Sequence, residues 1–312
     1  MKLNFRPWAP SLTAFGAWLQ GQSTQSAKSW SIRLRSKDRD KAEAAVTEAL
    51  AWDFIACRCD STRLAEVPGT GGVDFEFTSN DKTFLVEATN ISIASASDAT
   101  GMPDGQPFAG FHRLLTDRLR QKVRGKLDQA RQHSAHPVLV FVTTLHENAS
   151  AVCFCRLAVE FAMGSPPRIT GRLNPHTGEV EGELYDSTDL TRSVFLSPHP
   201  ILGADGNQVA QAKYQPISGL LVGGFGLRPS NVRVLGGLNP EATRPFDPSI
   251  LPDVPFCSFR EWPVTDRIGF HWTTTEEAEE LRERRLAENR LRAAGHGWLL
   301  DQIADEINPL PG

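Results

Sequence analysis

Apolar and polar residues alternate in two neighbouring segments, residues 73–77 and 84–88. The segment between them is polar and has Asn80 and Asp81 at its centre, a pair that favours a tight turn. Two alternating runs of this length around such a turn predict a β-hairpin. Side chains along a strand alternate between its two faces, so one face of the hairpin is apolar. The residues of that face are Val73, Phe75, Phe77, Phe84, Val86 and Ala88.

The opposite face of the predicted hairpin carries acids. With Asn80 and Asp81 at the centre of the turn, Asp74 lies directly across from Glu87. Opposed side chains on antiparallel strands have Cβ atoms about 5 Å apart. Two carboxylates that close repel each other unless a cation or a shared proton lies between them. The pair therefore indicates a site for a hard divalent cation such as Mg²⁺; the competing interpretation is a hairpin with acids on its solvated face.

A helical pattern precedes the hairpin, from Asp40 to about Ile55, with Glu48 in its middle. We expect a short strand over residues 55–59, between this helix and the hairpin. Residues 1–30 sustain no period, so an irregular arm packed on another part of the chain is expected there. The basic run that follows this arm is usually a solvated face, although it could also contact phosphates.

A long loop over residues 91–109 and a basic helix over residues 111–132 are predicted after the hairpin. Pro137 ends any continuation of the helix. The run that follows, residues 138–143, is continuously apolar, which is typical of a central buried strand. The remaining expected elements are a buried helix over 149–163, short strands over 217–222 and 232–235, and a charged helix over 275–294.

Composition bounds the class of protein. Of 312 residues, 40% are hydrophobic and 22% charged, enough for a sizeable core in one large domain or one domain with appendages. The net charge of −4 means that any contact with nucleic acid must come from a local basic surface. No apolar run approaches the roughly 18 residues of a membrane span, so no membrane partner is expected. Five cysteines are an odd number for a disulfide framework, and a cytoplasmic location is expected.

The order of these elements resembles the core of the PD-(D/E)XK nuclease superfamily. The strings AVTEALAWDF, VPGTGGVDFEF, FLVEATN and KLDQARQHSAHPVLVFV are similar to segments of uncharacterised bacterial members. ISGLLVGG followed by NPEATRPF resembles their closing strands. The resemblance covers residues 41–262 and implies an α/β fold with a restriction-endonuclease-like core, a mixed central sheet flanked by helices. Residues 1–40 would then be an N-terminal arm, and residues 263–312 a charged helical C-terminal appendage.

The resemblance also implies roles for individual residues. Asp74 matches the motif aspartate and Glu87 the motif acid, and both would hold Mg²⁺. Glu48 matches the acid of the first helix, where it would hold a metal ion or orient a metal-bound water. Glu43, one helical turn earlier, is the alternative to Glu48.

This chain departs from the family pattern at the motif lysine. Glu87-Ala88-Thr89 puts threonine where the family usually has lysine, and threonine carries no positive charge. Some relatives recruit that lysine from the following helix, so Lys126 or Lys122 would supply it here. We favour Lys126 because its separation along the sequence from Pro137 and the buried strand is more like that of the corresponding lysine in those relatives. If neither lysine reaches the acids, the fold would be catalytically inactive.

The expected function is a divalent-metal-dependent nuclease that hydrolyses phosphodiester bonds, with DNA as the expected substrate. Mg²⁺ is the expected cofactor, Mn²⁺ is a substitute, and a homodimer is left open. The catalytic residues would be Asp74, Glu87, Glu48 and Lys126. One alternative is a catalytically inert nucleic-acid-binding or scaffold module on the same fold, which Thr89 favours. Another is an unrelated hydrolase or binding domain.

Overall fold

The structure is a computed structural model. It describes residues 6–65, 72–102, 113–133, 135–164, 172–173, 180–181, 193–196, 201–202, 208–209, 213–226, 232–260, 262 and 269–274. All but the last three of these residues belong to one compact unit, Met1–His271, and the rest to a second, Trp272–Gly312. The predicted helix over residues 275–294 lies outside the described residues, as does most of the predicted appendage.

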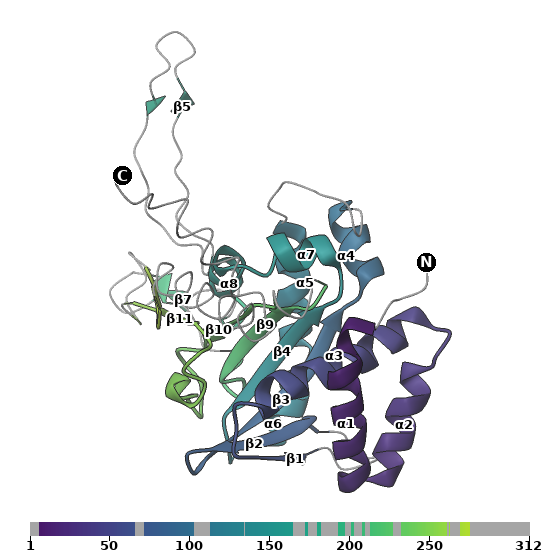
Figure 1. Ribbon diagram of the computed structural model, residues 1–312. Helices are drawn as coiled ribbons and strands as arrows, with labels where there is room; N and C mark the ends of the chain where they lie inside the picture. Colours follow the sequence, from purple (N-terminus) through teal and green to yellow (C-terminus); the bar gives the residue numbers. More distant parts are fainter. Residues whose placement is uncertain are drawn as a thin grey trace, which may run out of the picture. The chain divides into compact units, whose positions relative to one another are not determined.

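A mixed eight-stranded sheet forms the centre of the first unit (Figure 1). In spatial order its strands are β1 (Ser61–Leu64), β2 (Phe75–Ser79), β3 (Lys82–Ile91), β4 (Val138–Thr144), β9 (Gly219–Gly224), β10 (Val234–Leu238), β11 (Phe256–Phe259) and β12 (Phe270–Trp272). Strands β1 to β3 are antiparallel, β3, β4 and β9 are parallel, β10 is antiparallel to β9, and β11 is parallel to β10. The predicted α/β class, with a mixed sheet flanked by helices, is confirmed.

The predicted hairpin and its register are confirmed. Phe75 pairs with Val86 at one end of the β2–β3 ladder, and Ser79 pairs with Lys82 at the other. Asn80 and Asp81 join the strands with φ of 51° and 59°, the left-handed pair of a type I′ turn. Continued by one residue beyond the last pair, this register sets Asp74 across from Glu87.

Three helices at the N-terminal end of the chain lie on the apolar side of the hairpin, two of them packing on it and the second packing on the other two (Figure 1). They are α1 (Ala9–Gln22), α2 (Thr24–Leu34) and α3 (Arg39–Ala56). Helix α3 confirms the predicted helix, whereas the prediction of an irregular arm is wrong for residues 6–30, the part of that arm that the structure describes. Ser23 caps α2 by accepting the N–H of Ser26, and the rings of Phe15 and Trp30 meet edge to face in the core. A few large aromatic side chains bury these helices, so the sequence shows no sustained helical period.

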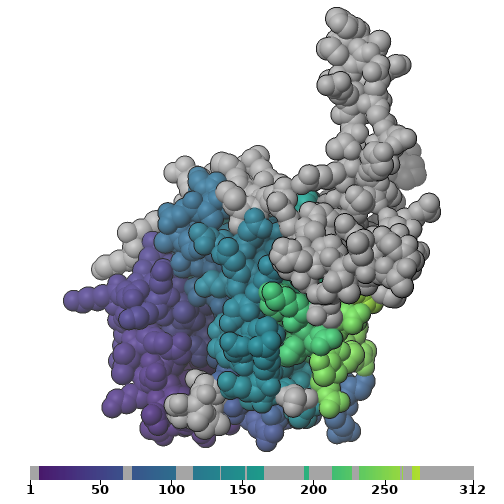
Figure 2. Space-filling model, turned by 180° about the vertical axis from the view of Figure 1, so that it is seen from behind, coloured from purple at the N-terminus to yellow at the C-terminus, as the bar shows by residue number. Residues whose placement is uncertain are grey.

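The opposite face of the sheet is covered by residues that follow the hairpin, and Figure 2 shows them in blue and teal between the purple N-terminal helices and the green later strands. Helix α5 (Arg113–Arg124) packs on β3 and β4, and α8 (Arg156–Met163) packs on β10. The single helix predicted over residues 111–132 is interrupted, because α6 (Leu127–Arg131) starts anew after Gly125 with Lys126 as its N-cap. The first two residues of the predicted helix, 111 and 112, lie outside the described residues.

Other predicted boundaries moved. The strand expected over residues 55–59 is wrong, because α3 continues through Ala56 and the strand is β1. The loop expected over residues 91–109 contains α4 (Ile93–Thr100), which Ser92 caps. The helix expected over residues 149–163 is split into α7 (Glu147–Val152) and α8. Strand β4 is buried along its whole length, as predicted. Among the described helices, none combines the length and the apolar character that crossing a membrane requires.

The short elements complete the description. Strands β5 (Arg172–Leu173) and β6 (Val180–Glu181) pair with each other, as do β7 (Ile201–Leu202) and β8 (Gln208–Val209). Two 3-10 helices, η1 (Arg6–Trp8) and η4 (Pro248–Ile250), flank regular segments.

Candidate active site

Asp74 lies where β2 begins and where the edge of β3 would otherwise be open. The amide N–H of Ala88 donates to Oδ2 of Asp74 at 2.7 Å. The carbonyl of Asp74 accepts the N–H of Ala65 at 3.1 Å, which ties the residue to the end of β1. The carboxylate therefore takes the place of a strand partner beside β3, and both its side chain and its main chain are held in position.

Glu87 lies in the middle of β3 and is almost fully buried, with 3% of its surface exposed. The ammonium Nζ of Lys126 lies 2.6 Å from its Oε1. Buried charges are tolerated in proteins when they are paired, and a charge-assisted hydrogen bond of this length is a strong one. Because α5 ends at Arg124 and α6 begins anew, Lys126 sits at a helix terminus and reaches the sheet.

The charges of the site act together on Asp74. Burial raises the pKa of the Asp74 carboxyl well above its ordinary value, and the charges of Glu87 and Glu48 raise it further. The N–H of Ala88 and the charge of Lys126 lower it, but less. Three acids therefore share a partly buried space with two cations, Lys126 at Glu87 and Arg33 at Glu48, and a further cation would relieve the repulsion that remains.

Glu48 belongs to α3 and forms an ion pair with Arg33. The guanidinium Nη2 of Arg33 lies 2.7 Å from Oε2 of Glu48. Arg33 belongs to α2, so the N-terminal helices contribute a side chain to the surroundings of the site. Arg33 belongs to the basic run for which a solvated face or a contact with phosphates was expected. Because α2 itself was not predicted, no sequence signal placed this arginine beside Glu48.

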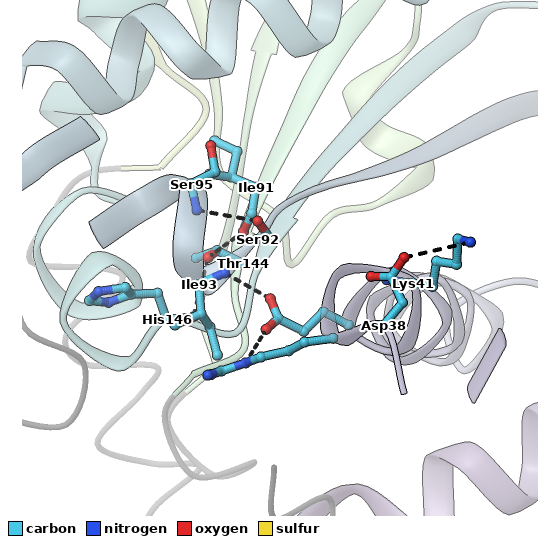
Figure 3. A network of polar contacts seen from close by, with 10 residues as sticks. Asp38, Lys41, Ile91, Ser92, Ile93, Ser95, Thr144 and His146 are labelled. Carbon is cyan, nitrogen blue, oxygen red and sulfur yellow. Dashed lines mark hydrogen bonds and ion pairs between the residues drawn. The ribbon is translucent and has the colours of Figure 1, made fainter. Parts of the chain in front are cut away.

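Glu43, the alternative to Glu48, is engaged elsewhere. Its Oε2 accepts the N–H of Ile93 at 2.7 Å, and its Oε1 lies 2.8 Å from Nε of Arg39. Figure 3 shows this network at the start of α4, where Ser92 caps the helix and Thr144 bonds to the end of β3. Burial raises the pKa of Glu43 despite these partners. These contacts join α3 to α4, so we assign Glu43 a structural role.

Lys122 is influenced by the charge of another acid, Asp40. Burial lowers the pKa of Lys122, the charge of Lys126 lowers it further, and the charge of Asp40 raises it. Asp40 is in the first turn of α3. Of the two lysines proposed to replace the motif lysine, Lys126 is the one that contacts Glu87. The carbonyl of Thr89 is used between β3 and β4, where it accepts the hydroxyl of Thr143 at 3.1 Å.

Asp74 and Glu87 are the carboxylates of this site that could hold a magnesium ion with few protein ligands. Within the part of the chain that the structure describes, no three His, Cys, Asp or Glu side chains are grouped so that they could hold a metal ion. Mg²⁺ usually keeps several waters and binds through one or two carboxylates and the phosphate of its substrate. Asp74 and Glu87 match that requirement. Direct metal ligation by Glu48 remains a prediction.

Comparison of the chain with protein-family models, with curated proteins and with solved structures finds no match. The functional assignment therefore depends on the chemistry of Asp74, Glu87, Lys126 and Glu48 and on the order of the elements that carry them.

Proposed function

We propose that this chain is a divalent-metal-dependent nuclease that hydrolyses phosphodiester bonds, with DNA as its substrate. The observation that carries the proposal is the buried contact between Lys126 and Glu87, 2.6 Å long, beside Asp74. A nuclease of the type suggested by the sequence needs a fixed cation next to its acid pair, and Thr89 cannot supply one. The contact supports Lys126 as that cation.

The arrangement of elements supports a restriction-endonuclease-like core. Helix α3 precedes three antiparallel strands, β1 to β3, and helix α5 leads from β3 to the parallel strand β4. The sequence resemblance implies the same order. The acids of the site lie on α3, immediately before β2, and on β3, the three positions expected for them.

The proposed roles follow from these positions. Asp74 and Glu87 would hold Mg²⁺ or Mn²⁺ together with the carbonyl of Ala88. A bound divalent ion supplies an activated water and neutralises charge on the phosphate. Lys126, fixed by Glu87, would stabilise the charge that develops on the attacked phosphate. Glu48, held by Arg33, would orient a water molecule at the edge of the site.

The test is cleavage of supercoiled plasmid DNA, and of labelled single-stranded DNA and RNA, with Mg²⁺, Mn²⁺ or EDTA. We expect cleavage of DNA that requires the divalent ion and is lost in Asp74→Asn and in Glu87→Gln. The matched control is Asp81→Asn, an acid at the far end of the same hairpin whose left-handed backbone asparagine tolerates. Cleavage by Asp74→Asn at the wild-type rate would place the chemistry elsewhere. DNA binding without cleavage by the wild type would favour the inert module.

A further inference from the structure

A second feature lies on the same face of the hairpin as the acid pair. It is a pocket of about 400 Å³ whose lining includes Glu76 and Leu85. These two residues pair with each other across β2 and β3, two residues along the strands from Asp74 and Glu87. Two residues of strand span about 7 Å and return to the same face. The pocket therefore lies one short step from the proposed site of cleavage.

Helix α6 connects the two places. Lys126, at its N-terminus, contacts Glu87, whereas Gln132 and His133, just past its C-terminus, line the pocket. Nε2 of His133 accepts the N–H of Val73 at 3.3 Å. Because Val73 precedes Asp74, the wall of the pocket is bonded to the chain that positions the acid. Gly72 has a φ of +136°, and a side chain there would come within 3.1 Å of that nitrogen.

The lining favours an uncharged, flat ligand. On one wall, Arg63 meets Glu76 through two contacts, Nε to Oε1 at 2.5 Å and Nη2 to Oε2 at 2.8 Å. Because each charge balances the other, this wall offers little net positive charge to a phosphate. The lining also includes the imidazoles of His133 and His136, which are rings able to stack on a flat ligand, the apolar Leu85, and Gln132, whose amide can both donate and accept hydrogen bonds.

We propose that this pocket receives a single nucleobase, that of a nucleotide next to the phosphate to be cleaved. Its volume is within the range of small-ligand pockets, and its mixture of flat, apolar and amide groups suits a base better than a phosphate. The phosphate of the same nucleotide would stay outside, toward Lys126. This inference rests on the proposed function, but it concerns binding and is testable without cleavage.

The experiment measures binding in EDTA by fluorescence anisotropy at low salt. The probes are a labelled thymidine octamer and an octamer of abasic residues with the same phosphates. The pocket is filled by Ala135→Phe, since Ala135 lines it and is exposed. The control is Ala151→Phe, an equally exposed alanine on α7. We expect Ala135→Phe to weaken binding of the thymidine octamer about tenfold, the value of one stacked base, and to leave the abasic octamer unchanged.

Two outcomes would overturn the inference. Equal weakening of both octamers by Ala135→Phe would mean that this region contacts the backbone, and no weakening of either would mean that no base enters the pocket. Loss of thymidine binding in Ala151→Phe would show that the substitution acts through the fold. If the wild type prefers the thymidine octamer but cleaves nothing with Mg²⁺, the proposed function fails while the base pocket stands.

Discussion

The two ends of the β2–β3 hairpin each carry a lysine–carboxylate ion pair, and the pairs differ in burial. At the turn, Nζ of Lys82 lies 2.5 Å from Oδ2 of Asp247, with side chains 53% and 43% exposed. At the open end, Nζ of Lys126 lies 2.6 Å from Oε1 of Glu87, with side chains 24% and 4% exposed. The contact distances are nearly equal, so distance alone does not distinguish a surface ion pair from a candidate catalytic one.

Burial reverses the effect on neighbouring acids. At the turn, hydrogen bonds from Lys82 and Ser249 lower the pKa of Asp247 to about 2. At the open end, burial and two further acids raise the pKa of Asp74 even though Lys126 opposes them. The exposed Asp247 is balanced by one cation, whereas Asp74, Glu87 and Glu48 carry more negative charge than Lys126 and Arg33 balance. That imbalance is what a divalent cation would correct.

The largest expected effect separates the two lysines. Lys126→Ala should lower the rate of Mg²⁺-dependent DNA cleavage about 10²-fold, the usual loss when a preorganised charge is removed from a site. DNA binding should weaken much less, because other phosphate contacts remain. Lys82→Ala, which breaks an equally short ion pair at the turn, should leave the rate within about twofold, since exposed pairs contribute little. Single-turnover kinetics and anisotropy measure the two quantities.

Removing Lys126 leaves Glu87 buried beside fewer positive charges, so folding is checked by circular dichroism. Lys126→Gln, which keeps a hydrogen-bond donor, is the second variant and should lose the same rate. Equal loss of binding and rate would make Lys126 a phosphate-contact residue. A large effect of Lys122→Ala with none of Lys126→Ala would assign the role to the preceding turn of α5.

A comparison within α3 has the next largest effect. Glu43→Ala should lower the free energy of unfolding by about 2–3 kcal/mol, because the N–H of Ile93 loses a buried acceptor and Arg39 a partner. Glu48→Ala should cost less, about 1 kcal/mol, since its ion pair with Arg33 is partly exposed, with side chains 17% and 39% exposed, yet lower the cleavage rate about tenfold. Urea unfolding and cleavage assays separate them. If Glu43→Ala stays folded and loses more of the cleavage rate than Glu48→Ala does, the two roles are reversed.

The raised pKa of Asp74 predicts a dependence of stability on pH. The folded state binds this proton more tightly than the unfolded chain does, so the free energy of unfolding falls as pH rises from the ordinary aspartate pKa of 3.8 through the raised value. Asp74→Asn has no charge to bury and should be more stable than the wild type at pH 7, by on the order of 1 kcal/mol. Urea unfolding at pH 4 and pH 8 measures the difference.

The turn end predicts the opposite sign. The pKa of Asp247 is lowered to about 2, so its contribution is present above pH 3.8 and lost as pH falls toward 2. Asp247→Asn should therefore destabilise the protein at pH 7, by only a few tenths of a kcal/mol because the pair is half exposed.

At the open end, Mg²⁺ should raise the melting temperature of the wild type more than that of Asp74→Asn. If Mg²⁺ raises the melting temperature of both equally, the ion binds elsewhere.

The last expected effect, a gain in stability, is at the turn itself. Asp81→Gly removes a side chain from a backbone with φ of 59°, and Asn-Gly is the preferred type I′ pair. The variant should gain up to about 1 kcal/mol in free energy of unfolding, with no change in cleavage. Thermal unfolding measures the gain. A loss of stability would show that a contact of the Asp81 side chain stabilises the protein by more than its left-handed backbone destabilises it.

Local chemistry made the hairpin predictable. Alternation along β2 and β3 and the pair Asn80-Asp81 are properties of neighbouring residues, so they specified the strands, the turn and the register that opposes Asp74 and Glu87. The same holds for β4, whose continuous apolar run requires burial on both faces. Helices α1 and α2 were not predicted from the sequence, because their burial depends on a few aromatic residues that contact other parts of the chain.

The sequence by itself determined the α/β class, the hairpin and the two facing acids, because each depends on residues close together in the chain. Only the tertiary structure decided which lysine reaches Glu87, since α5 ends at Arg124 and Lys126, at the start of α6, contacts Glu87. The tertiary structure also distinguished the role of Glu43 from that of Glu48. The two acids lie about one helical turn apart on the same helix, so the sequence alone does not show which of them faces Asp74. Burial and long-range pairing set these choices, and both arise only when distant segments pack.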